Sequence, residues 1–121
     1  MIILRMTMNA LPEKQLELMQ TLFSMIEPTE KETGCVSCTV FCDIEDKTLF
    51  SLIGEWENRE NLDHYIRSNR FGVLLGTKIL LCEPLNIQIF TVVRSEGMEA
   101  IVAMRSNEMN SDKHVHKKYR A

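Results

Sequence analysis

The sequence has no long apolar run, and its opening stretch, MIILRMTMNALPEK, lacks a basic segment and a small-residue cleavage site. Because a membrane-spanning helix needs about 20 mostly apolar residues, we predict no membrane partner and no signal peptide. An excess of one charge sign is also missing. The 14 Lys and Arg against 17 Asp and Glu give a net charge of −3, so we expect no nucleic-acid partner.

Cysteine and tryptophan are scarce, with 4 Cys and 1 Trp in 121 residues. A chain of this length builds a core without disulfides, and it shows no secretion signal, so we predict reduced thiols and a cytoplasmic location. Cys35, Cys38 and Cys42 lie close together in the sequence. Strand alternation directs Cys38 and Cys42 to one side and Cys35 to the other. We therefore predict buried thiols and no metal site.

Hydrophobic periodicity divides the chain into alternating strands and helices. Strands are expected at residues 2–8, 35–43, 48–56 and 85–93. The first helix begins near Pro12 and ends at Pro28, and its apolar positions are Leu16, Met19, Leu22, Phe23 and Ile26. Two further helical stretches lie between the third and fourth strands. This order, with a hairpin in the middle, is typical of an α+β, ferredoxin-like fold.

The segment 50–71 contains the most informative pattern. Phe50, Leu52, Gly54 and Trp56 alternate on one strand face, and Asn58 then provides an N-cap for a helix. Gly54 has no side chain, so the space beside Trp56 is predicted to admit a flat ligand. The structural alternative is that Trp56 only fills the core.

Both faces of the strand at 35–43 are apolar in the sequence. Val36, Cys38 and Val40 occupy one face, and Cys35 and Phe41 the other. A strand in a single antiparallel sheet normally has one solvated face. We therefore predict a homodimer in which the sheet of a second subunit covers the face without helices.

The C-terminal segment is less regular. Residues 98–105 suit a short additional helix, whereas residues 106–121 are polar and without periodicity. We predict one domain at residues 1–105, followed by a disordered tail at residues 106–121.

Glu55-Trp56-Glu57, followed by Leu62, Tyr65, Ser68 and Phe71, resembles the antibiotic biosynthesis monooxygenase (ABM) domain family. The similarity covers roughly residues 1–94. It implies a dimeric α+β barrel made of ferredoxin-like βαββαβ subunits. Some members of the family oxygenate quinols or phenols without a metal or flavin, so the resemblance implies no cofactor.

The resemblance also suggests site residues. It implies catalytic roles for Trp56, Tyr65 and Arg70, and ligand contacts for Asn9, Trp56 and Phe71. Asn9 equally suits a turn between strand and helix. Many members have a His at the position of Tyr65 and another just before Phe71, where this chain has Arg70. Because neither Tyr nor Arg readily accepts a proton near neutral pH, this difference weakens the prediction of oxygenase chemistry.

Two functions follow as hypotheses. The first is a cofactor-independent monooxygenase acting on a quinol or another aromatic small molecule. The alternative is a non-catalytic small-molecule-binding or regulatory dimer with the same fold. A third reading, a purely structural dimerisation module, requires that the cavity be filled by Trp56 and Met side chains.

Overall fold

The computed structural model describes residues 1–114 of the chain. Its elements in order are β1 (Ile2–Asn9), the 3-10 turn η1 (Pro12–Lys14), α1 (Gln15–Glu30), β2 (Cys35–Cys42), β3 (Leu49–Trp56), α2 (Arg59–Ile66), α3 (Asn69–Gly76), the 3-10 turn η2 (Thr77–Leu80), β4 (Asn86–Thr91) and α4 (Met98–His114). No helix among these residues has the length and apolar character needed to cross a membrane.

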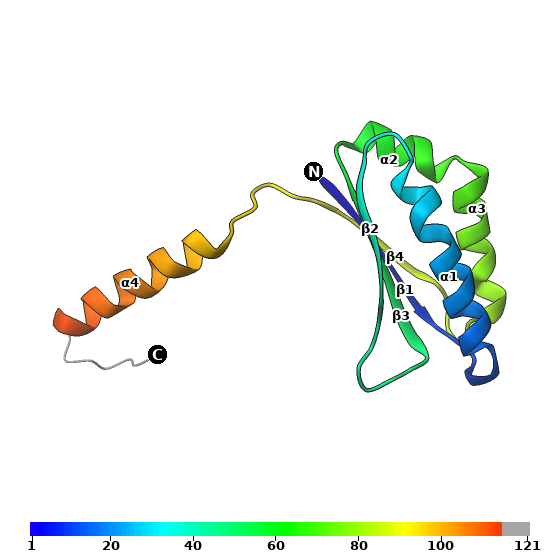
Figure 1. The fold of residues 1–121 in the computed structure, drawn as a ribbon, viewed down its shortest axis with the longest axis horizontal. Coiled ribbons are helices and arrows are strands. Elements are labelled where there is room, and N and C mark those ends of the chain that lie inside the picture. Colours follow the sequence, from blue (N-terminus) through cyan, green and yellow to red (C-terminus); the bar gives the residue numbers. More distant parts are fainter. Residues whose placement is uncertain (115–121) are drawn as a thin grey trace.

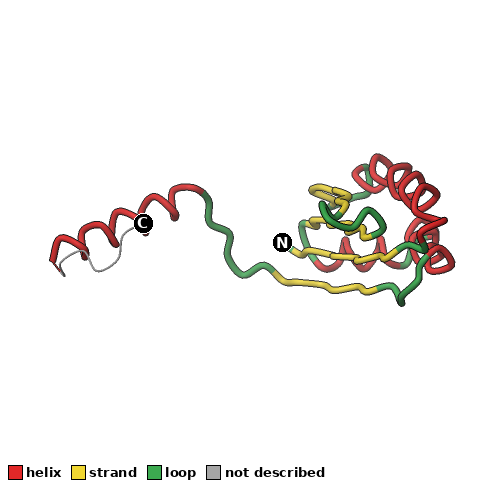
Figure 2. Tube along the Cα trace, turned by 90° about the horizontal axis from the view of Figure 1, so that it is seen from below, coloured by secondary structure: helices red, strands yellow, loops and turns green. Residues whose placement is uncertain are grey.

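The strands form one antiparallel sheet in the order β2-β3-β1-β4. Helices α1, α2 and α3 cover one face of the sheet, and no helix within residues 1–114 covers the other face, which we call the open face (Figures 1 and 2). This arrangement confirms the predicted ferredoxin-like α+β fold. The pairing of two such subunits into a barrel stays a prediction.

The helix-facing side of the sheet carries the core. Ile2, Leu4, Met6 and Met8 of β1 are buried, as are Phe50, Leu52, Gly54 and Trp56 of β3. The register places Leu4 opposite Gly54 and Met6 opposite Leu52. Every second residue of both strands therefore faces the helices, as alternation predicts.

The strand β2 differs from the expected alternation. Its register against β3 shifts between Cys35 and Ser37, which is a β-bulge. The bulge pairs Cys35 with Trp56 and packs it against the core, on the same side as buried Cys38. The prediction that Cys35 and Cys38 face opposite sides was wrong, because the extra residue reverses the alternation between them.

The helix α1 buries a different face from the predicted one. Its buried residues are Leu18, Leu22, Met25 and Thr29, whereas Leu16, Met19 and Phe23 are exposed. Pro28 lies inside the helix, which continues to Glu30. Of the predicted apolar positions Leu22 is buried, but the predicted face was otherwise wrong, because an apolar series at helical spacing does not reveal which side packs on the sheet. The predicted end of the helix at Pro28 was also wrong.

Side-chain caps begin the two helices that follow β3. Asn58 accepts a hydrogen bond from the backbone N–H of Asn61, and Ser68 accepts one from that of Phe71. Each cap satisfies an N–H group that the helix leaves free, worth about 1 kcal/mol. The change of direction at Ser68 separates α2 from α3 and sets Phe71 over the core.

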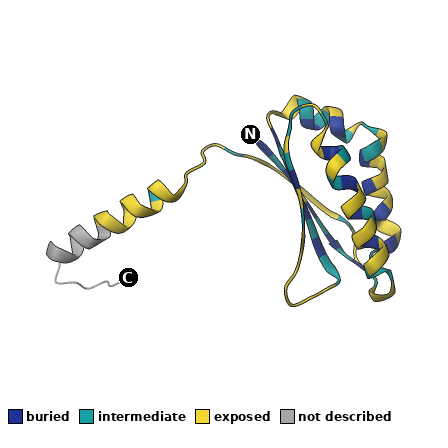
Figure 3. Cartoon of the chain, in the orientation of Figure 1, coloured by how far each residue is buried: buried dark blue, intermediate teal, exposed yellow. Residues whose placement is uncertain are grey.

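The strand β4 and the helix α4 depart from the compact body. All residues of β4, which is an edge strand of the sheet, are exposed. The helix α4 projects away from the sheet (Figure 3). The helix extends well beyond the predicted residues 98–105, so residues 106–114, expected to belong to a disordered tail, are helical. The rest of the predicted tail lies outside the described residues, and the proposed domain boundary stays a prediction.

Candidate functional site

Three aromatic side chains pack against one another between the sheet and the helices. The rings of Trp56 and Tyr65 are stacked, with centroids 4.8 Å apart, and those of Tyr65 and Phe71 meet edge to face at 5.4 Å. Only 0% of Trp56, 1% of Tyr65 and 3% of Phe71 is exposed. The structure thus brings together three of the predicted site residues, but it encloses them completely.

The space beside Gly54 is filled by the indole of Trp56. A Cβ atom added to Gly54 would lie 3.0 Å from Nε1 of Trp56. The buried Nε1 has no hydrogen-bond partner in the described part of the chain. The absence of a side chain at Gly54 therefore accommodates Trp56 itself and leaves no room there for a flat ligand.

The hydroxyl of Tyr65 connects this aromatic cluster to α1. It is hydrogen-bonded to Oγ1 of buried Thr29, 3.2 Å away. Burial raises the pKa of Tyr65 to about 12, although the hydrogen bond between Tyr65 and Thr29 opposes the shift. The phenol consequently stays protonated at neutral pH and does not serve there as a general base.

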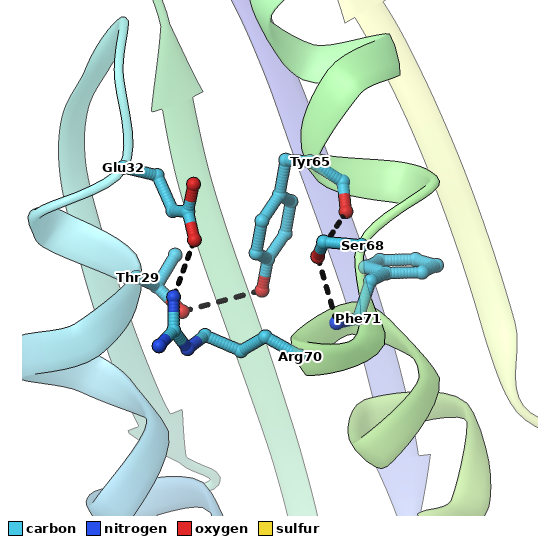
Figure 4. A network of polar contacts seen from close by, with 6 residues as sticks. All are labelled: Thr29, Glu32, Tyr65, Ser68, Arg70 and Phe71. Atoms are coloured by element: carbon cyan, nitrogen blue, oxygen red, sulfur yellow. Dashed lines mark hydrogen bonds and ion pairs between the residues drawn. The ribbon is translucent and has the colours of Figure 1, made fainter.

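Arg70 lies outside the aromatic cluster, at the first turn of α3. Its guanidinium forms an ion pair with the carboxylate of Glu32, which follows α1 (Figure 4). In the same view the hydroxyl of Tyr65 points toward Thr29 and Arg70. Arg70 and Glu32 are thus partly exposed side chains that lie near the hydroxyl of the buried Tyr65 ring.

A surface groove of about 750 Å³ runs along this region. Its walls combine apolar and charged side chains: Phe23, Ser24, Ile26, Glu27, Pro28, Lys31, Glu32, Thr33 and Arg70. Concave sites with apolar walls and a few polar groups are typical of ligand binding. The groove is the candidate site, with Arg70 and Lys31 as its cations.

The sequence analysis missed Thr29 and Glu32. Thr29 follows Leu18, Leu22 and Met25 at intervals of three or four residues, so the helical spacing marks it as part of the buried face. Glu32 carries no such signal, because its pairing with Arg70 joins residues 38 positions apart.

Asn9 lies elsewhere. It pairs with Leu49 at one end of the sheet, whereas Trp56 pairs with Ile2 at the other, about 23 Å along β1. The side-chain oxygen of Asn9 accepts a hydrogen bond from the Thr48 hydroxyl at 3.0 Å. The backbone carbonyl of Asn9 accepts another from the backbone N–H of Cys82. These contacts are those of a residue that fixes a turn.

The cysteines do not form a metal centre in the described region. Within residues 1–114, no three His, Cys, Asp or Glu side chains are grouped so that they could hold a metal ion. Burial raises the pKa of Cys38 to about 12, so its thiol is neutral at physiological pH. That the protein binds no metal stays a prediction. The prediction of buried thiols was wrong for Cys42, which is exposed.

Comparison with known proteins identifies the family. The family model "Antibiotic biosynthesis monooxygenase" matches residues 1–74. An uncharacterised Synechocystis protein, sll1783, is 26% identical over 88 residues, which are 72% of this chain and 60% of that protein. The chain therefore spans less than two thirds of the length of this curated relative.

Solved structures share the fold. A Deinococcus radiodurans protein named for the same family superposes with a TM-score of 0.74 at 21% identity, over 80% of this chain and 97% of its own. A conserved protein from Methanosarcina mazei gives a TM-score of 0.69 at 30% identity, over 74% of this chain and 89% of its own. The match of the family model to more than half of the chain shows that this protein belongs to the antibiotic biosynthesis monooxygenase family.

Proposed function

We propose that the protein binds a phenolic or quinol-like small molecule in the groove between α1 and α3 and oxygenates it slowly, without a cofactor. Membership of the monooxygenase family supports oxygenation. The observation that carries the binding site is the position of Arg70, which lines the groove and lies beside the hydroxyl of Tyr65 (Figure 4). A cation there attracts a phenolate oxygen, while the apolar wall receives the ring.

In this proposal the residues of the groove have different roles. The ligand ring lies against Ile26 and Pro28, and its oxygen displaces the Glu32 carboxylate from Arg70. Arg70 then lowers the pKa of the bound phenol electrostatically. Trp56, Tyr65 and Phe71 form the wall behind the site, and in this proposal the Tyr65 ring moves aside on binding so that the ligand contacts Trp56.

The chemistry needs a proton acceptor. Tyr65 and Arg70 do not qualify, and of the two carboxylates in the groove, Glu27 and Glu32, it is Glu32 that contacts Arg70. In the overall reaction one atom of O₂ enters the ring and the other leaves as water, so that a hydroquinone and O₂ give a hydroxyquinone and water. All the electrons come from the quinol. We propose that Glu32 takes the phenolic proton while Arg70 stabilises the anion.

A second candidate is a binding protein without catalysis. It is favoured by the complete burial of Trp56 and Tyr65 and by the indole that fills the space at Gly54. In this case a ligand occupies the outer groove only, and the aromatic cluster serves as core.

Assembly as a homodimer through the open face is part of the proposal. Phe41 and Phe90 are 50% and 41% exposed, and strand alternation places both on the open face, beside Ile3 and Ile53. The Arg5 guanidinium lies over the Phe90 ring, 5.2 Å from its centroid. A second sheet packed there removes this apolar surface from water. The cytoplasmic location also remains a prediction.

The test combines a binding and a turnover measurement. A panel of quinols and phenols is titrated by calorimetry while O₂ uptake is recorded with an electrode. We expect Arg70→Ala to weaken binding about tenfold, as the loss of one charge-assisted hydrogen bond does, and to reduce O₂ uptake further. Trp56→Ala should weaken binding more than Arg70→Ala does.

The matched control is Arg59→Ala, which removes an ion pair with Asp63 on α2, outside the groove. It should leave both measurements unchanged. Binding without O₂ uptake above the blank favours the non-catalytic alternative. If no compound binds, both functions are refuted and the structural reading of the Trp56 cluster prevails.

A further inference from the structure

The helix α4 carries apolar side chains that no part of the chain described by the structure covers. Met98, Ile101 and Val102 are 72%, 56% and 56% exposed. Their spacing of three and four residues places them on one side of the helix. Figures 1 and 2 show α4 standing clear of the body of the protein. Within residues 98–107 of α4, whose side chains the structure describes, none forms an ion pair or a side-chain hydrogen bond with the sheet or with α1–α3.

A helix of this kind needs a surface to pack on. It has 17 residues, only slightly more than the length of about 12–15 residues below which isolated helices are marginal in water, and most helical stability in proteins comes from packing an apolar face. Compared with the Deinococcus radiodurans protein, 80% of this chain covers 97% of that one. The uncovered fifth of this chain matches in length the segment that begins with α4, so we infer that α4 is an addition to the common fold.

A matching surface exists on α1. Leu16, Met19 and Phe23 are 57%, 42% and 76% exposed, and their spacing aligns them along the outer side of the helix. We call these three residues the α1 stripe. The residues of the α1 stripe were predicted from the sequence to belong to the apolar face of the helix, but they do not pack in the core. Phe23 also lines the groove, so the stripe borders the candidate site.

The two surfaces belong to opposite sides of one chain. The link from β4 leads α4 away on the open-face side, whereas α1 lies on the other side of the sheet (Figure 1). If the sheet of a second copy packs on the open face, the helices of that copy lie on the same side of the first sheet as α4. Packed sheets lie about 10 Å apart, with the helical layer of the second copy beyond its sheet by a similar distance. Residues 92–97 reach about 20 Å when extended, which suffices to bring α4 beside those helices.

We propose that α4 is an exchanged arm, which packs its Met98–Ile101–Val102 face on the α1 stripe of a second copy of this chain. This inference rests on the homodimer in the proposed function. Burial of one large apolar side chain removes on the order of 100 Å² from water. Three side chains from each helix, at two symmetry-related contacts, bury roughly 1,200 Å², which is comparable to a specific protein interface. Each arm then borders the groove of the other subunit.

The test is disulfide trapping between two distinguishable full-length chains. Both chains carry Cys42→Ser and Cys82→Ser, because these two cysteines are exposed. One chain carries Met19→Cys and the other, with a mass tag, carries Ile101→Cys. The chains are mixed, left to exchange subunits and oxidised, and the products are weighed by mass spectrometry. We expect a disulfide between a tagged and an untagged chain.

The matched control replaces Ile101→Cys by Ala103→Cys, which lies on the other side of α4 and should give at least tenfold less cross-linked product. A single chain with both Met19→Cys and Ile101→Cys tests the alternative of a helix folded back on itself. An intrachain disulfide in that variant at low concentration, without interchain product, overturns the exchange.

Light scattering of the unmodified chain distinguishes failure of the exchanged α4 arm from failure of the homodimer itself. A dimer mass without a disulfide between the mixed chains refutes the exchanged arm and leaves the sheet dimer standing. A monomer mass at tens of micromolar refutes both. As a second measurement, Ile101→Glu should raise the dimer dissociation constant at least tenfold, whereas Ile44→Glu, in the exposed loop between β2 and β3, should leave it unchanged.

Discussion

Substitution of Gly54 by alanine tests whether the cluster around Trp56 is fully packed. The added methyl group would lie 3.0 Å from Nε1 of Trp56 and 3.9 Å from the carbonyl oxygen of Ser37. The indole has little freedom to retreat, because it is 0% exposed and stacked on Tyr65. Gly54→Ala therefore forces a shift in a close-packed core.

The expected magnitude follows from two opposing terms. Overpacking a core costs about 1–3 kcal/mol, whereas replacing glycine inside a strand by alanine recovers about 0.5–1 kcal/mol of backbone entropy. The net loss should be about 1 kcal/mol in the free energy of unfolding, or a fall of about 4 °C in the melting temperature for a domain of this size.

Urea unfolding followed by the fluorescence of Trp56, the only tryptophan, measures this loss and reports the indole environment directly. Because association affects apparent stability, all variants are compared at one protein concentration. The matched control is Gly72→Ala in α3, where an added Cβ meets nothing within 4 Å. It should stabilise the protein by up to about 1 kcal/mol. Unchanged stability and emission for Gly54→Ala would mean that a cavity adjoins Trp56 and that the packing argument is wrong.

Three further results are expected. Tyr65→Phe should lower stability by about 1 kcal/mol at pH 7, through loss of the hydrogen bond to Thr29. Because folding raises the pKa of Tyr65 from 10.0 to about 12, its stabilising contribution is present below pH 10 and is lost as the pH rises toward 12; the alkaline loss of stability in urea titrations should be shallower in the variant. Exposed Cys42 should react with a thiol reagent in the native protein, whereas buried Cys38 should not. Equal reaction rates of the two thiols would contradict the burial of Cys38. Gly34→Ala should cost at least about 1–2 kcal/mol in thermal unfolding, since its φ is +81° and the new Cβ would lie 2.1 Å from Nδ2 of Asn61.

Local patterns in the sequence predicted the elements and their order. The alternation of Phe50, Leu52, Gly54 and Trp56 identified β3 and its buried face, and Asn58 marked the start of α2. These features are readable because strand alternation and helix capping involve residues close together in the chain.

The buried face of α1 was decided only by tertiary packing. Leu16, Met19 and Phe23 have the spacing of a core face, but the helix packs Leu18 and Leu22 on the sheet. Both series are apolar, so periodicity does not distinguish them. The bulge that turns Cys35 toward the core is likewise a property of the pairing of β2 with β3.

The candidate site shows the same division. The sequence by itself determined that Trp56, Tyr65 and Phe71 belong to one strand-to-helix unit, because that unit is continuous in the chain. Only the tertiary structure joined Tyr65 to Thr29 and Arg70 to Glu32, since these contacts span 36 and 38 residues. It also separated Asn9 from the site, because an eight-residue strand places its ends at opposite edges of the molecule. Proximity across such distances arises from the packing of α1, α2 and α3 on a shared sheet, which no local pattern encodes.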